Sequence, residues 1–256
     1  MTPETSEVRR ARGLYLLPNL FTTAVLFCGF YAIIAALQGR FESAAVAVFV
    51  AMVLDGLDGR VARLTHTESD FGAEYDSLAD LISFGLAPAL IMYQWALGAM
   101  VGMGPFLSKL GWLAAFFYTV MAALRLARFN VQIGSTDQRY FTGLPSPSAA
   151  AIVTGLVWFS TDLGLTGIQM LWPALIVIIG AGALMFSNIL YLSFKQVDLR
   201  GRVPFVAALL VVLALVFISI DPPKVLFGGF LLYGLSGPVL FLWRWRRHSR
   251  RQTGNP

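Results

Sequence analysis

Apolar stretches alternate with short polar connections along the whole chain. A helix needs about 20 apolar residues to cross the roughly 30 Å of hydrocarbon in a bilayer. Eight stretches approach or exceed that length, the fifth and seventh being the shortest: residues 14–37, 43–64, 71–98, 111–129, 147–161, 170–192, 204–220 and 224–243. The pattern predicts an all-α, polytopic transmembrane helical bundle of about eight spans. We place it in one domain over residues 1–243, followed by a basic tail over residues 244–256.

Composition supports a membrane protein. Hydrophobic residues make up 57% of the chain, charged residues 13%, and the mean hydropathy is +0.70. These values exceed those of a soluble globular protein of this length. The first apolar stretch is too long for a signal sequence and lacks a small-x-small cleavage site, so we expect a retained helix. The single cysteine, Cys28, excludes an intrachain disulfide.

The basic residues predict the orientation. Sixteen of the 19 Lys and Arg residues lie at the two termini and in the connections between spans 2–3, 4–5 and 6–7. By the positive-inside rule, both termini are then cytoplasmic. The net charge of +5 does not indicate nucleic-acid binding, because the cations cluster at the ends of apolar stretches. The tail that begins at Trp243 pairs tryptophans with arginines, which is typical of contacts with anionic headgroups.

Four aspartates interrupt this apolar sequence within 26 residues: Asp55, Asp58, Asp76 and Asp80. An acid inside the hydrocarbon layer is costly and indicates a functional site. Four neighbouring carboxylates cannot all remain bare anions, so either some are protonated or cations neutralise them. Ion pairs with Arg60 and Arg63 are the simpler alternative, but they would account for only two of the acids.

The spacing of the acids predicts that they converge. Positions 55, 58, 59 and 62 follow the i, i+3, i+4, i+7 pattern of one helical stripe, and positions 76 and 80 lie one turn apart. Gly56, Gly59 and Ala62 would let a neighbouring backbone or a ligand approach closely. Oxygen ligands without histidine or cysteine suit Mg²⁺ or Mn²⁺. Two such ions would neutralise the acids and bind a diphosphate.

The acids form part of a longer pattern, Asp55-x2-Asp58-Gly59-x2-Ala62-Arg63-x8-Gly72-x3-Asp76-x3-Asp80. Every specified position matches the signature of the CDP-alcohol phosphatidyltransferases, and we identify the chain as resembling that family. The resemblance implies an all-helical membrane enzyme with a six-helix core and a dinuclear Mg²⁺ or Mn²⁺ site near the cytoplasmic face. Family members displace CMP from a CDP-linked lipid or alcohol by a hydroxyl nucleophile, and they are often homodimers.

Further segments resemble the phosphatidylserine synthase branch: LPNLFT at 17–22, SFGLAPA at 83–89, LRLARFN at 124–130 and FTGLPSPSAA at 141–150. This likeness implies CDP-diacylglycerol and L-serine as substrates, with phosphatidylserine and CMP as products. It also implies a bacterial cytoplasmic (inner) membrane location, with the active site facing the cytoplasm. Another acceptor, such as glycerol 3-phosphate, an inositol phosphate or choline, remains an alternative. The chain has Val25 where the branch leads us to expect asparagine.

Roles follow from the motif positions. The resemblance implies that Asp55, Asp58, Asp76 and Asp80 are metal ligands, and that Asp80 is also the general base for the serine hydroxyl. The residues implied to hold the CDP-lipid are Gly59, Arg63, Ser69 and Gly72, with Asn19 and Thr22 as further candidates.

Two arginines near the end of the fourth stretch are candidates for the acceptor side. Arg125 or Arg128 would bind the serine carboxylate or a lipid phosphate, or both would be positive-inside anchors. Pro145 and Pro147 predict a turn before the fifth stretch. For Ser83 we expect a hydrogen bond to its own helix backbone rather than to substrate.

A cation transporter with an acidic ion pathway is the alternative from another functional class. Transporters of that kind tend to show repeat symmetry and broken helices near the midplane. The four acids lie together toward one side, and no other part of the sequence repeats them.

Overall fold

The computed structural model describes residues 4–65, 69–132, 140–192 and 205–252. Its helices are α1 (Glu4–Leu37), α2 (Phe41–Thr65), α3 (Asp70–Asp80), the π-helix η1 (Leu81–Leu86), α4 (Ala87–Trp95), the 3₁₀ segment η2 (Leu97–Met103), α5 (Pro105–Gln132), α6 (Ser146–Asp162), α7 (Leu171–Phe186), α8 (Phe205–Ile220) and α9 (Pro222–Gln252). All eight predicted stretches are therefore mainly helical, which confirms the all-α class.

Four helical segments in the described ranges are long and apolar enough to cross a membrane: Asn19–Leu37, Asp70–Trp95, Pro105–Val131 and Pro222–Phe241. The total of eight spans and the cytoplasmic termini stay predictions.

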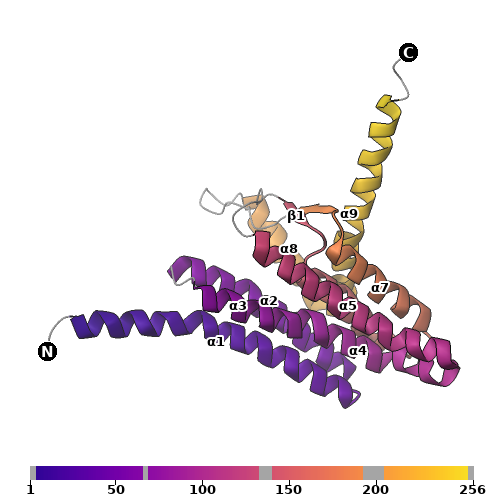
Figure 1. Cartoon of the computed structure of the whole chain (residues 1–256), viewed down its shortest axis with the longest axis horizontal. Coiled ribbons are helices and arrows are strands. Elements are labelled where there is room, and N and C mark those ends of the chain that lie inside the picture. Colours follow the sequence, from indigo (N-terminus) through magenta and orange to yellow (C-terminus); the bar gives the residue numbers. More distant parts are fainter. Residues whose placement is uncertain (1–3, 66–68, 133–139, 193–204, 253–256) are drawn as a thin grey trace.

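Small residues hold the first two helices together. α1 and α2 run side by side as a hairpin (Figure 1), joined by a tight turn at Gly39, whose φ is +73°. The alanines along this pair are almost fully buried: Ala32, Ala35, Ala36, Ala44, Ala45, Ala47 and Ala51. Small side chains let membrane helices approach closely and gain contacts along their length. The hairpin carries Asp55 and Asp58 on the last turns of α2.

The predicted third helix over 71–98 differs from the structure. It is divided into α3, the six-residue π-helix η1, and α4, and it ends at Trp95 before η2 begins. Pro88 has no backbone N–H, so it cannot donate to the Phe84 carbonyl four residues earlier. The Tyr118 hydroxyl of α5 donates to that carbonyl instead, at 3.0 Å. A π-helical turn of this kind widens the helix and often occurs at functional sites.

The predicted sixth helix over 170–192 also ends early. α7 stops at Phe186, and the next residues form strand β2 (Leu190–Leu192), which pairs antiparallel with β1 (Tyr140–Thr142). The register joins Phe141 to Tyr191. Gly143 follows β1 with φ +84°, and a Cβ there would lie 2.2 Å from the Met185 carbonyl oxygen. The close crossing of the two chain segments therefore requires glycine.

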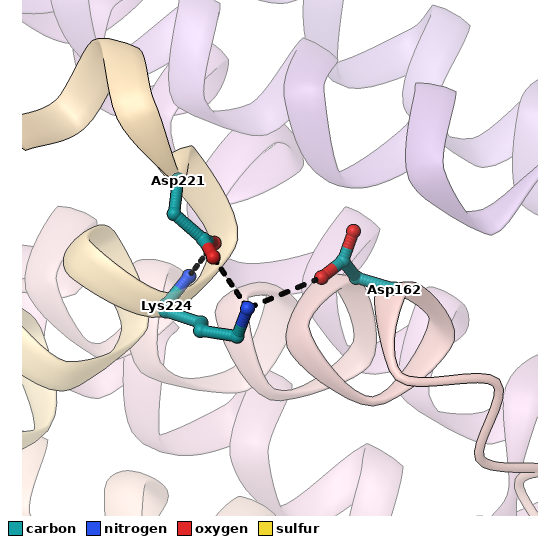
Figure 2. Close-up of polar contacts among 3 residues, drawn as sticks. All are labelled: Asp162, Asp221 and Lys224. Carbon is teal, nitrogen blue, oxygen red and sulfur yellow. Dashed lines mark hydrogen bonds and ion pairs between the residues drawn. The ribbon is translucent and has the colours of Figure 1, made fainter.

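A small ion-pair cluster joins α6 to α9 (Figure 2). The Lys224 ammonium pairs with the Asp221 carboxylate and lies 4.0 Å from the Asp162 carboxylate. Asp162 is the last residue of α6, whereas Ser146 is the first. These exposed charges therefore mark the end of the bundle opposite Ser146, and exposed pairs contribute little to stability.

Candidate active site

Three of the four predicted acids converge. Asp55 comes from α2, while Asp76 and Asp80 come from successive turns of α3. Each offers a carboxylate oxygen, and these oxygens lie within 4.8 Å of one another. The i, i+4 spacing aligns the two α3 acids, and α3 packs mainly on α1. The acids of α2 and α3 thus meet through their side chains.

Asp58 lies beside these three acids, but it is not part of the group whose carboxylate oxygens lie within 4.8 Å of one another. Its side chain is buried, and its Oδ2 atom accepts a hydrogen bond from the Thr22 hydroxyl of α1 at 3.4 Å. It still lies close enough to Asp55 and Asp76 for their charges to repel its own. The role of Asp58 as a fourth metal ligand stays a prediction.

Asp80 brings a buried oxygen atom to the cluster. Its Oδ1 atom is buried and has no hydrogen-bond partner among the described residues. Repulsion from Asp55 and Asp76 acts on it, opposed by attraction to Arg125 of α5. Arg125 alone cannot balance four carboxylates, and leaving a buried charge unpaired is costly. Converging oxygen atoms with this surplus of negative charge fit a hard divalent cation.

Several CDP-lipid candidates cluster at the start of α3. The Ser69 hydroxyl caps the helix by accepting a hydrogen bond from the Gly72 N–H at 3.1 Å. A Cβ on Gly72 would lie 3.1 Å from that hydroxyl oxygen and 3.7 Å from Asn19 Oδ1. Asn19, Ser69 and Gly72 therefore lie together.

The other CDP-lipid candidates lie on or beside α2. The Gly59 N–H hydrogen-bonds to the Asp58 carboxylate, so Gly59 and Thr22 both hold that side chain. The side chain of Arg63 lies outside the described part of the structure. At Gly56 a Cβ would meet no described atom within 4 Å, so close backbone packing does not explain this glycine.

The two candidate arginines have different surroundings. Arg125 donates from Nη1 to the Ser146 hydroxyl at 2.8 Å and attracts Asp80. Arg128 donates from Nη2 to Asn188 Oδ1 at 2.9 Å, and its guanidinium carbon lies 5.9 Å from the centre of the Phe186 ring. Of these two arginines, Arg125 is therefore the one whose charge acts on the acidic cluster.

Ser83 differs from the prediction. Its hydroxyl donates to the Val25 carbonyl of α1 at 3.0 Å, rather than to its own helix backbone. The reason is the close crossing of α1 and η1, where a Cβ on Gly29 would lie only 2.8 Å from Ser83 Cα. The position where we expected asparagine, Val25, is a buried packing residue at this crossing.

Sequence reasoning missed the groups that hold the site together. Ser77 and Asn130 hydrogen-bond to each other between α3 and α5, with the amide nitrogen donating to the hydroxyl at 3.0 Å. The Thr23 and Tyr75 hydroxyls lie 3.0 Å apart between α1 and α3. Each pair joins residues more than 50 positions apart, so no local spacing signals them.

Comparison with known proteins agrees with the geometry. The family model described as CDP-alcohol phosphatidyltransferase matches residues 15–218. A CDP-diacylglycerol–serine O-phosphatidyltransferase from Helicobacter pylori is 38% identical over 225 residues, covering 87% of this chain and 90% of the relative. A protein of the same name from Mycobacterium leprae is 34% identical, over 82% of this chain and 68% of the relative. Another from Bacillus subtilis is 37% identical, over 52% of this chain and 70% of the relative. The chain belongs to the CDP-alcohol phosphatidyltransferase family.

Proposed function

We propose that the protein transfers the phosphatidyl group of CDP-diacylglycerol to L-serine, giving phosphatidylserine and CMP. The convergence of Asp55, Asp76 and Asp80 carries this proposal, because grouped carboxylates suit both the binding of a divalent cation and the role of a base. The similar proteins from H. pylori and M. leprae are named for transfer to serine, which supports serine as the acceptor.

Asp80 acts as the general base. A serine hydroxyl is a poor nucleophile at neutral pH and needs a base within hydrogen-bond reach. The buried Oδ1 atom of Asp80, which has no partner in the described structure, is available to accept the proton. The serine oxygen then forms a bond to the phosphatidyl phosphorus, and the bond from that phosphorus to the CMP oxygen breaks. CMP leaves with the electron pair of that bond.

The acids would hold Mg²⁺ or Mn²⁺ through Asp55, Asp76 and Asp80, with Asp58 beside them. Bound divalent ions stabilise charge on a diphosphate and make CMP a better leaving group. Two ions would match the four carboxylate charges, which supports a dinuclear site. The residues that would orient the CDP-lipid are Asn19, Thr22, Gly59, Arg63, Ser69 and Gly72. They lie at the cytoplasmic side on this proposal, so that nucleotide and serine arrive from water while acyl chains stay in lipid.

The test is CMP release by the purified protein in lipid with CDP-diacylglycerol and one acceptor at a time. We expect release with serine, and release with glycerol 3-phosphate but none with serine would refute the proposal. Asp80→Asn should lower turnover by about 100-fold or more, since general-base catalysis contributes about 10²–10⁴-fold. Binding of CDP-diacylglycerol should remain. Asp162→Asn, at the opposite end of α6, is the matched control.

A further inference from the structure

Arg125 keeps one donor unpaired beside the acidic cluster. Nη1 donates to Ser146, but the Nε atom is buried and has no partner in the described ranges. A buried donor without an acceptor costs about 1–3 kcal/mol, and more when the group is charged. A buried donor without a partner therefore indicates a bound ligand, ion or water, or a catalytic role. The guanidinium is near enough to Asp80 for the two charges to attract, so an anion bound at Nε would lie in the neighbourhood of the proposed base.

Ser146 reaches Arg125 because of local backbone geometry. Pro145 is the N-cap residue of α6, with φ −56° and ψ 137°, and Pro147 lies in the first turn. Both prolines suit these positions, since the ring fixes φ and the missing N–H is not needed at a helix start. Ser146 is nearly fully buried at this turn. Its hydroxyl therefore holds one edge of the guanidinium in a fixed place.

α9 supplies the other side. Tyr233, in the middle of α9, lies near enough to Arg125 to interact with it electrostatically. Tyr191 of β2 fixes this part of α9, because the two tyrosine rings lie 5.6 Å apart and the Tyr191 hydroxyl donates to the Gly234 carbonyl at 2.9 Å. α9 begins at Pro222, beyond the residues that the family model matches. A helix outside the shared core thus borders the site.

We propose that Arg125 binds the α-carboxylate of the amino-acid acceptor, in a subsite bordered by Ser146 of α6 and Tyr233 of α9. This inference rests on the proposed function, which places the acceptor hydroxyl at Asp80. Serine carries its carboxylate two carbons from its hydroxyl, so adjacent contacts at Asp80 and Arg125 suit one small molecule. The planar guanidinium matches a carboxylate with paired N–H donors. Choline has no group for this contact.

The first test uses the wild-type protein and changes the acceptor. Serinol has the amino group and hydroxyl of serine, with a second hydroxymethyl group in place of the carboxylate. We expect kcat/KM for serinol to be at least about tenfold below that for serine, because the site would hold an unpaired arginine. Equal values for the two acceptors would overturn the carboxylate subsite. Absence of CMP release with serine itself would instead remove the proposed function.

The second test changes the protein. Arg125→Lys keeps the charge but loses the paired donors. It should raise KM for serine by at least about tenfold, leave KM for CDP-diacylglycerol nearly unchanged, and reduce the preference for serine over serinol. Tyr233→Phe should shift KM for serine in the same direction by a smaller factor. Arg40→Lys is the matched control. That guanidinium lies over the Tyr31 ring, toward the C-terminal end of α1 and away from Asn19 and Thr22.

The two substrates separate a carboxylate subsite from a phosphate subsite. A raised KM for CDP-diacylglycerol with an unchanged KM for serine would show that Arg125 binds lipid phosphate, which contradicts the inference. A fall in kcat with both KM values unchanged would contradict it as well, since Arg125 would then act only through Asp80. If Arg125→Lys fails to fold, Tyr233→Phe and the serinol comparison still decide.

Discussion

Removing one hydroxyl from α5 should weaken the π-helix that follows Asp80. In Tyr118→Phe, the Phe84 carbonyl loses the donor that Tyr118 supplies at 3.0 Å. Pro88 has no N–H to replace that donor. Tyr118 and Phe84 are both fully buried, so water cannot replace it without opening the bundle. The carbonyl oxygen would therefore stay without this hydrogen bond in the folded protein.

The magnitude follows from known hydrogen-bond energies. The net contribution of one hydrogen bond is about 0.5–1.5 kcal/mol in proteins generally. Interhelical hydrogen bonds in a membrane protein average about 0.6 kcal/mol, with a maximum of about 1.7 kcal/mol. We expect Tyr118→Phe to lower the free energy of unfolding by about 1 kcal/mol. Turnover should also fall, because a shift of about 1 Å at a catalytic group can cost about 100-fold.

Equilibrium unfolding in mixed detergent micelles measures the first effect, and CMP release under conditions where the variant is fully folded measures the second. Tyr93→Phe on α4 is the control, since the partly buried Tyr93 makes no side-chain hydrogen bond within the described ranges. Wild-type stability and wild-type turnover in Tyr118→Phe would refute the proposed role of this hydrogen bond. A loss equal to that of Tyr93→Phe would refute it as well.

Two further predictions concern packing and charge. Gly29→Ala would place a Cβ 2.8 Å from Ser83 Cα. It should therefore lower the free energy of unfolding by about 1–3 kcal/mol. Gly180→Ala is the control and should leave the free energy of unfolding unchanged, because its Cβ would meet no described atom within 4 Å. At Asp221, the hydrogen bond from the Lys224 side chain lowers the pKa. Stability from a lowered carboxylate pKa is present above the unfolded value of about 3.9 and is lost as pH falls through the folded value. Asp221→Asn should therefore lower stability slightly at pH 7 and not at all well below about pH 3.9. Thermal unfolding of both proteins across this pH range measures the difference, and a difference that does not change with pH would contradict the prediction.

Periodicity predicted the helices well because lipid imposes a simple rule on the backbone. Every N–H and C=O inside the bilayer needs a partner within the chain, so long apolar stretches become helices. The convergence of Asp76 and Asp80 with Asp55 was predictable for the same reason, since helical spacing fixes which side chains share a face. Such local rules do not determine where a helix widens or stops.

The errors in prediction come from contacts between distant residues. Ser83 was expected to bond its own helix, but Gly29 lets α1 approach so closely that the Val25 carbonyl is the better acceptor. The early end of α7 depends on β1 pairing with β2, about 50 residues later in the chain. Tyr233 had no local signal at all. Its importance comes from a tyrosine on β2 and an arginine on α5.

On our proposal, Asp80 lies at the boundary between the acidic cluster and Arg125. Asp55 and Asp76 repel its charge, while Arg125 attracts it. On our proposal the diphosphate lies with the cation-neutralised acids and the acceptor carboxylate lies on the guanidinium, so the two anionic substrates are kept apart. The hydroxyl and the phosphorus then meet only at the boundary. This separation explains why one aspartate can border the cation site and also take the proton, since Asp80 is the acid that interacts most directly with both sides.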